Sequence, residues 1–344
     1  MNIKQAIRDW MLPIAMVAGA AMYLVYHAMP APVHKAGPFL EVAAGIIQPL
    51  LIFSMLFLTF CRIEPKDLKP HRWHWWLLLI QGGLFTLLGL GAYAIIRHLP
   101  VSYHNHVVLI ECAMLCLICP TATAAAVVTR KLGGDVAGIT TYTILINMLA
   151  AVLVPLVVPL IQPVAGLDFW LAFSMILAKV FPLLIMPCLV AWLVRYLMPK
   201  FHKRLLETPD LAFYIWAISL TLAIAVSMKY LMASVLGMTM IGLMALVSFI
   251  CCVFQFAMGR YVGSRYKPRR PDVNPEVERR GREVRRVTAG QSLGQKNTVF
   301  AIWLGYTFMT PETAIVGGLY SIWHNVYNSW QLYRHEHVHD NAKL

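Results

Sequence analysis

Two short polar segments interrupt apolar stretches of the chain, and they hold residue types suited to binding a solute. The first is Cys119-Pro120-Thr121-Ala122-Thr123, about midway along one apolar stretch. The second is residues 290–297, Gly-Gln-Ser-Leu-Gly-Gln-Lys-Asn, directly ahead of the apolar residues 299–309. Where a helix breaks at membrane depth, freed amides form a positive pole that holds anions, and freed carbonyls can coordinate a cation. The two breaks together predict a transporter.

The chemistry of the first break supports a half-helix that begins there. Pro120 can occupy the first helical position, because the N–H that it lacks would have no partner there. Small side chains after it let a ligand or an opposing helix approach the backbone, and the hydroxyls of Thr121 and Thr123 supply specificity. The alternative is a kinked helix that only packs, which the presence of a second break disfavours.

Composition places these breaks in a membrane protein. The chain has 344 residues, of which 59% are hydrophobic and 13% charged, a balance that no soluble domain of this length needs. About 20 apolar residues cross a hydrocarbon layer of roughly 30 Å. The predicted spans are 11–29, 39–61, 73–97, 106–131, 135–162, 168–198, 209–229, 231–264, 280–309 and 312–333.

The distribution of basic residues predicts the orientation. The net charge is +13, which would suggest nucleic acid as a partner if the cations formed one patch. With the amino terminus inside, however, 24 cations fall on inner segments and 3, Lys35, Arg97 and Lys229, on outer loops. This is a positive-inside pattern. It predicts a multi-pass protein of the inner (plasma) membrane with both termini cytoplasmic, whose surroundings are lipid and not nucleic acid.

The ten predicted spans form two halves of similar length, residues 1–162 and 163–344, and each half has its break in its fourth span. Because five is an odd number, the second half must enter from the opposite face. This predicts an all-α fold built as a five-plus-five inverted repeat. Residues 265–286 form a basic cytoplasmic loop suited to anionic lipid headgroups. The tail 335–340 alternates histidine with other potential ligands, and we interpret it as adventitious metal capture.

Two lysines, Lys179 and Lys296, fall inside predicted spans. Each needs a reason, because an ionised side chain at mid-membrane costs on the order of 3 kcal/mol. We interpret Lys179 as mainly structural. Lys296 could hold an anionic substrate or stand in for an absent ion, and a lysine that changes protonation would suit proton-linked or uncoupled transport. Alternatively it snorkels, or pairs with an internal carboxylate such as Glu111, itself a candidate proton carrier.

The motifs at the breaks resemble those of the bile acid:sodium symporter family and its bacterial relatives, over most of the chain. Residues 119–123 look like the family's Cys-Pro-Gly-Gly-Thr crossing, and Gln291 and Gln295 keep the polar spacing of its second crossing. Residues 321–325, Ser-Ile-Trp-His-Asn, match its Ser-x-Trp-His-Asn. The resemblance implies ten helices, with spans four and nine unwound and crossed, divided into a core and a panel domain.

The resemblance also implies roles by position, with Lys296 in the place of an asparagine that faces the substrate. Together with the breaks, it gives as substrate-binding residues Pro120, Thr121, Thr123, Lys296, Asn297, His324 and Asn325. The positions that correspond to ion ligands are Gln81, Thr143, Gln291 and Gln295.

The ion positions also carry the largest departures from the family. Its Ser-Asn pair after the crossing is Ala125-Ala126 here, its next serine ligand is Ile139, and its shared glutamate is Gln291. Sodium prefers several oxygen ligands and, in a low-dielectric site, usually a carboxylate. Na⁺ is therefore a possible but unexpected partner, and no other cofactor or metal is expected.

The sequence thus predicts a secondary active transporter of organic anions, either bile-acid-like molecules or small carboxylates, that works by alternating access. A cation/proton antiporter of similar architecture is one alternative, although the crossing lacks the acidic residues that such exchange needs. A membrane receptor that binds an organic anion without transporting it is another. Catalysis is not expected, because Cys119 and His324 form the only candidate pair of reactive groups at the breaks.

Overall fold

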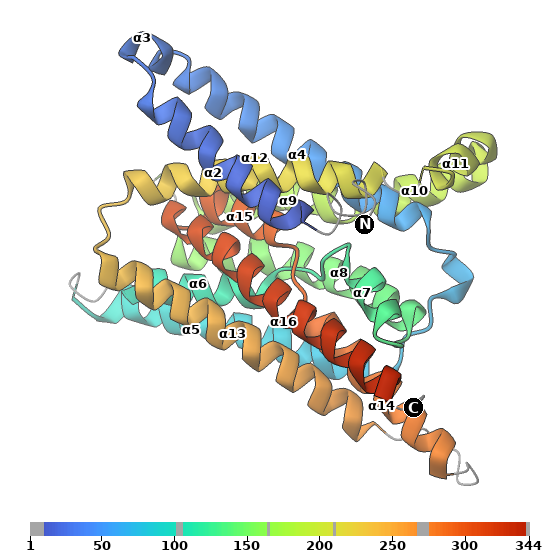
Figure 1. Ribbon diagram of the computed structural model, residues 1–344. Helices are drawn as coiled ribbons and strands as arrows, with labels where there is room; N and C mark the ends of the chain where they lie inside the picture. The colour runs from blue at the N-terminus through green and yellow to red at the C-terminus, as the bar shows by residue number, and fades with distance from the viewer. Residues whose placement is uncertain (1–9, 101–105, 164–165, 209–210, 267–274, 342–344) are drawn as a thin grey trace.

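The computed structural model describes residues 10–100, 106–163, 166–208, 211–266 and 275–341. These residues are almost entirely helical (Figure 1). The α-helices are α2 (Met11–Ala28), α3 (Ala31–His34), α4 (Gly37–Cys61), α5 (Arg72–His98), α6 (Val107–Ile118), α7 (Ala125–Lys131), α8 (Val136–Ile161), α9 (Phe169–Leu184), α10 (Met186–Leu197), α11 (Pro199–Leu206), α12 (Leu211–Ala233), α13 (Met238–Arg265), α14 (Pro275–Gly294), α15 (Thr298–Phe308) and α16 (Ala314–Asn341). Two 3-10 turns, η1 (Pro65–Asp67) and η3 (Pro311–Thr313), join neighbouring helices.

Seven helical segments of the described chain are long and apolar enough to cross a membrane. They are α2, α4, α5, α8, α9 with α10, α12 and α13, all at predicted positions. The predicted span 168–198 is divided at Ile185, between Pro182 and Pro187. Proline removes a helical N–H and crowds the preceding turn, which accounts for the interruption.

The other three predicted spans differ from simple apolar rods. Residues 106–131 and 280–309 are each broken, so that α6 and α15 are apolar but short. The predicted span 312–333 begins in the turn η3, and from Ala314 onward it lies within the unbroken α16. This helix is less apolar because polar side chains such as Ser321, His324 and Asn328 are buried along it.

The basic segment 265–286 is not wholly a loop, in contrast to the prediction. Residues 275–286 form the first turns of α14, in which Arg280 and Arg286 pair with Glu276 and Glu283 one turn away. Residues 267–274 of this segment lie outside the described residues. In the tail 335–340, the helix α16 continues, but the side chains beyond His335 are not among those described.

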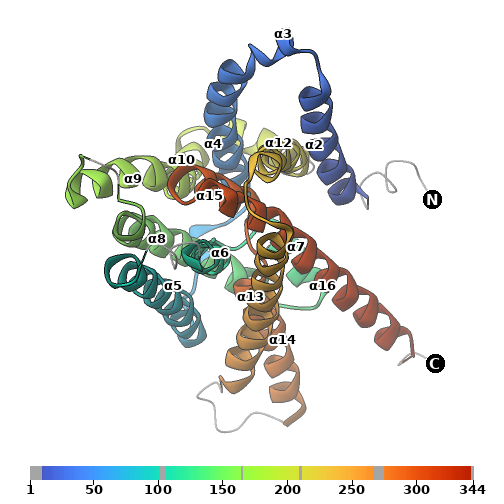
Figure 2. The same ribbon diagram turned by 90° about the vertical axis from the view of Figure 1, so that its left-hand side faces the viewer.

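The helices pack in two groups. In one, α4 packs on α10 and α12, and α2 packs on α12. In the other, α5 packs on α6 and α8, while α13 packs on α14, α16 and α6. Figure 2 shows α2 and α4 standing apart and joined at one end by α3, on the side away from the α13–α14 pair. The short helices α6 and α15 are apolar on all sides and lie in the main hydrophobic core.

Candidate functional site

The first break separates α6 from α7. The helix α6 ends at Ile118, and Cys119 takes an extended ψ of 132°. The residue before a proline is excluded from the helical region by the proline ring, so Pro120 fixes the end of this half-helix. The next half-helix, α7, begins only at Ala125. Pro120 therefore ends α6 and does not occupy the first position of the next half-helix, in contrast to the prediction. The chain is therefore extended through Thr121, where its backbone polar groups need partners outside its own helix.

The second break separates α14 from α15. Residues 295–297 lie between Gly294, the last residue of α14, and Thr298, the first of α15. The side chain of Asn297 accepts a hydrogen bond from Phe300 N at 3.1 Å. This cap satisfies one of the free amides at the start of α15, and it places the positive end of that half-helix at the break.

The two breaks meet. Thr121 and Lys296 form an isolated antiparallel bridge, in which Ala122 N donates to Gln295 O at 2.9 Å and Asn297 N donates to Pro120 O at 2.8 Å. These bonds satisfy backbone groups that the interrupted helices leave free. The crossing is thus a short two-stranded contact between segments that lie about half the chain apart.

A small cavity lies beside this contact, with a volume of about 30 Å³. Its lining comes from both breaks and from α4, α12 and α16. The lining residues are Met55, Ala122, Thr123, Ala124, Trp216, Gln295, Lys296, Asn297, Thr298, Ser321, His324 and Asn325.

Three buried polar atoms of this lining have no hydrogen-bond partner among the described residues: His324 Nδ1, Asn297 Nδ2 and Gln295 Oε1. The three side chains are between 3% and 5% exposed. A buried polar group without a partner costs roughly 1–3 kcal/mol. The cavity therefore has hydrogen-bonding capacity that a ligand or water can satisfy.

Lys296 is 2% exposed, and its ammonium turns toward α6. Its Nζ donates to Leu117 O at 3.1 Å, at the carbonyl end of that half-helix. The ionisable groups that act on it are the thiols of Cys116, Cys119 and Cys251. The alternative in which Lys296 pairs with Glu111 is not what the structure shows, because no carboxylate is among these groups.

Comparison with known families assigns this chain to one of them. The model of the Sodium Bile acid symporter family matches residues 49–260, from within α4 to within α13. This chain belongs to that family. No curated protein matches it. As a member of the sodium bile acid symporter family with several apolar helices, it is a multi-pass membrane transport protein.

The structure places the predicted substrate-binding residues of this family member in two groups. Thr123, Lys296, Asn297, His324 and Asn325 line the cavity. Pro120 and Thr121 instead hold the crossing together, Pro120 through its carbonyl and Thr121 through its hydroxyl, which donates to Ser292 O at 2.8 Å.

The predicted ion positions do not form one cluster of free oxygens. Gln295 lines the cavity. Gln291 lies one turn before the break, where its Nε2 donates to Asn328 Oδ1 at 3.0 Å. The Thr143 hydroxyl donates to Ile139 O, within its own helix α8.

Gln81 bonds the carbonyl end of α6 through its amide nitrogen. Its Nε2 lies 3.2 Å from Cys119 O and 3.4 Å from Ile118 O, while its Oε1 accepts from Tyr142 Oη at 2.8 Å. Rotating the amide by 180° would set its oxygen against two carbonyl oxygens, so the network fixes this orientation. Gln81 thus acts as a donor at the crossing.

Replacing Gln81 by leucine is expected to lower the free energy of unfolding by about 3 kcal/mol, because it leaves carbonyls and a hydroxyl unpaired in the interior. The matched control is Gln48→Leu in α4. Gln48 is equally buried, and neither polar atom of its amide has a partner among the described residues. Its replacement is expected to be neutral or stabilising. Unfolding of both variants in lipid–detergent bicelles measures the difference, and equal losses would contradict it.

Lys179 and Glu111, which also lie in predicted spans, do not contact each other. Lys179 is exposed, with its Nζ 5.7 Å from the centre of the Phe308 ring. Glu111 is fully buried and accepts hydrogen bonds from Gln162 Nε2 at 2.6 Å and Thr310 N at 3.1 Å. Glu111 therefore joins the start of α6 to the ends of α8 and α15, away from the crossing.

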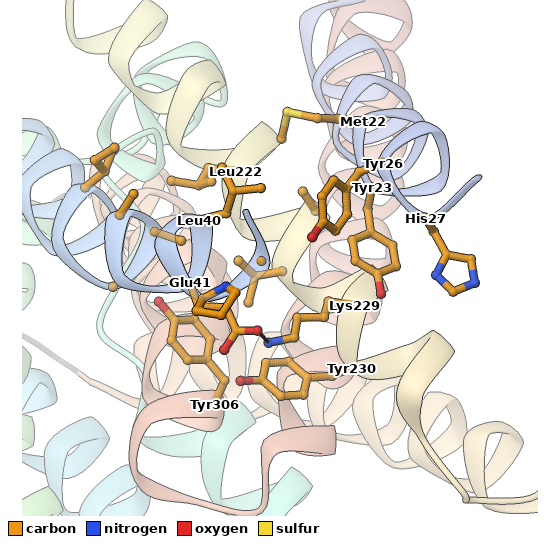
Figure 3. Close-up of a pocket in the computed structure, with 18 of the residues that line it drawn as sticks. Met22, Tyr23, Tyr26, His27, Leu40, Glu41, Leu222, Lys229, Tyr230 and Tyr306 are labelled. Atoms are coloured by element: carbon orange, nitrogen blue, oxygen red, sulfur yellow. Dashed lines mark ion pairs between the residues drawn. The ribbon is translucent and has the colours of Figure 1, made fainter. Parts of the chain in front are cut away.

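A larger cavity of about 800 Å³ lies between α2, α4 and α12, with Tyr306 of α15 at its edge (Figure 3). Glu41 and Lys229 face each other within it, with Lys229 Nζ 2.7 Å from Glu41 Oε1. These two charges cancel. The cavity therefore offers no net positive charge to an organic anion, in contrast to the crossing.

Sequence reasoning missed several residues at the crossing. The main one is Gln255, a fully buried amide of α13 whose Nε2 donates to Cys116 O at 3.2 Å and lies 3.0 Å from Tyr320 Oη. A glutamine in the middle of an apolar span is the kind of residue that marks a functional interior. This signal was available in the sequence. The contributions of Met55 and Trp216 had no such signal, because they depend on how α4 and α12 pack.

Proposed function

We propose that this protein is a secondary active transporter of organic anions, and that the anion binds at the crossing. The observation that carries the proposal is the convergence of three features on one cavity: the amino end of α15, the unpartnered His324 Nδ1 and Asn297 Nδ2, and the adjoining Lys296. The positive end of a half-helix, the Asn297 amide N–H and an imidazole nitrogen that donates when it carries the proton are together complementary to a carboxylate or sulfonate.

Charge supports an anion over a cation. Among the described buried side chains, Glu111 and Lys296 are the residues that ordinarily carry a full charge. Glu111 is bonded to Gln162 and Thr310 instead. An ammonium without a counter-ion is costly in a low-dielectric interior, and an anion bound nearby would offset that cost. A cation/proton antiporter would need the opposite arrangement, with carboxylates at the crossing.

The size of the cavity supports alternating access. A volume of about 30 Å³ holds roughly two water molecules, and an organic anion needs more room. We therefore infer that the helix groups of α4 and α12 and of α6 and α16 separate to admit the substrate. In this proposal the chain is a five-plus-five inverted repeat of ten spans in the plasma membrane, with both termini cytoplasmic, and transport involves no catalytic step.

Uptake of labelled organic anions into proteoliposomes tests the function directly. Accumulation against an empty-liposome control supports a transporter, whereas saturable binding without uptake would show a receptor. Bile-acid-like anions and small carboxylates are compared at equal concentration. Failure of every anion both to bind and to enter would refute the proposal.

His324→Ala is expected to raise the half-saturating anion concentration about tenfold, the equivalent of about 1.4 kcal/mol, because it removes a hydrogen bond to a charged group. The matched control is His34→Ala, which changes an exposed histidine of the α2–α4–α12 cavity. The control is expected to leave uptake unchanged. A larger effect at His34 than at His324 would show that the anion binds between α2, α4 and α12 and not at the crossing.

A further inference from the structure

The carbonyl end of α6 has the form of a site for a monovalent cation, but N–H groups of this chain already fill it. The last four carbonyls of a helix lack partners within that helix, and in transporters such half-helix ends coordinate sodium. Here they accept from Cys119 N (Leu115 O, 3.4 Å), Gln255 Nε2 (Cys116 O, 3.2 Å), Lys296 Nζ (Leu117 O, 3.1 Å) and Gln81 Nε2 (Ile118 O, 3.4 Å).

Only one of these donors is a cationic group. The carbonyl end of a helix carries a partial negative charge, which favours a positive group beside it. The Lys296 ammonium supplies that group, and as a compact charge with three N–H donors it resembles a small monovalent cation more closely than an arginine would. Its stem arrives from the opposite break, so the same side chain also ties the two breaks together.

The residues present do not fit a sodium ion at this position. Sodium needs several oxygen lone pairs directed at one point. The carbonyl of Leu117 accepts from Lys296 Nζ, and the carbonyl of Ile118 accepts from Gln81 Nε2, so Gln81 presents a nitrogen there and not an oxygen. The carboxylate that would offset the charge is absent, because Gln291 stands at that position and is bonded to Asn328.

We propose that the Lys296 ammonium is a covalently attached substitute for the cation that the family's name implies, and that this chain therefore carries its anion without sodium. The substitution itself rests on the contacts of α6 alone. Its consequence for transport rests on the proposed function.

Removal of the lysine should create the site that it fills. In Lys296→Ala, the space at Leu117 O is open, and a small cation can enter it. In Lys296→Met, an apolar chain of similar length fills the space without charge. The matched control is Lys179→Ala, which removes an exposed lysine from a predicted span.

Melting temperatures of the purified proteins in sodium, methylammonium and choline chloride at equal ionic strength test this site. We expect the wild type and Lys179→Ala to melt at the same temperature in all three salts. Lys296→Ala should melt lower than the wild type in choline. Methylammonium, which restores the missing ammonium group, should raise its melting temperature saturably and by more than sodium does, because the neighbouring carbonyls remain bonded to N–H donors. Lys296→Met should melt lower in all three without recovery.

Two results would overturn the proposal. One is a saturable stabilisation of the wild type by sodium relative to choline, a measurement that needs no variant to fold. The other is a Lys296→Ala protein that melts identically in the three salts. The corresponding transport measurement is anion uptake by the wild type in sodium, potassium and choline, and we expect equal rates in all three. If the wild type took up no anion, the proposed function would be refuted. The melting measurements would still show whether Lys296 occupies a cation site.

Discussion

If the crossing is the binding site, replacing Ala124 by tryptophan is expected to lower anion uptake about 100-fold. This loss is equivalent to about 2.8 kcal/mol. Ala124 is exposed at the start of α7 and lines the small cavity. An indole there would occupy the space that the substrate needs. Because the residue is exposed, the larger side chain should not disturb the folded protein. Uptake into proteoliposomes and the melting temperature are measured together.

Val127→Trp is the matched control for this substitution. Val127 lies on the same short helix, is 54% exposed and is not part of the cavity lining. It is expected to transport like the wild type. Equal loss in both variants would attribute the effect to α7 itself, and normal uptake by Ala124→Trp would place the substrate elsewhere.

A large loss of stability is expected from a substitution at Gly259, where α13 and α14 are in close contact. A Cβ at Gly259 would lie 2.9 Å from Gly290 Cα and closer still to the carbonyl of Ala289. These are backbone atoms, so the helices must separate to accept the methyl group. Gly259→Ala should lower the free energy of unfolding by about 3 kcal/mol.

Gly242→Ala is the matched control, because it is the same substitution on the same helix but is expected to raise the free energy of unfolding. A Cβ at Gly242 meets nothing within 4 Å, so the change should stabilise the helix by about 0.5–1 kcal/mol. Unfolding of both variants in bicelles gives the comparison. If Gly259→Ala were as stable as Gly242→Ala, the result would contradict the close contact between α13 and α14.

The positions of the breaks could be predicted from the sequence because they depend on local chemistry. Pro120 cannot continue α6, and the polar run that ends in Asn297 offers a helix cap. That the two breaks meet followed from a general property of transporters with paired interruptions. The structure shows this contact directly, as the bridge between Thr121 and Lys296.

Side-chain direction could not be predicted in the same way. The sequence places Lys296 at the crossing, but whether its ammonium points at the substrate or at Leu117 O depends on the register between two distant segments. The same holds for Gln81, whose amide nitrogen lies where an oxygen was predicted. The exposure of Lys179 depends on which face of α9 is covered, and composition alone does not determine that.

An experimental density map of the protein with a transported organic anion bound is the most direct test of the central claim. The account predicts density for the anion beside the amino end of α15, within hydrogen-bonding distance of His324 and Asn297, and no separate ion density at Leu117 O. Density for the anion between α2, α4 and α12, beside Glu41 and Lys229, with an unchanged closed crossing, would contradict it.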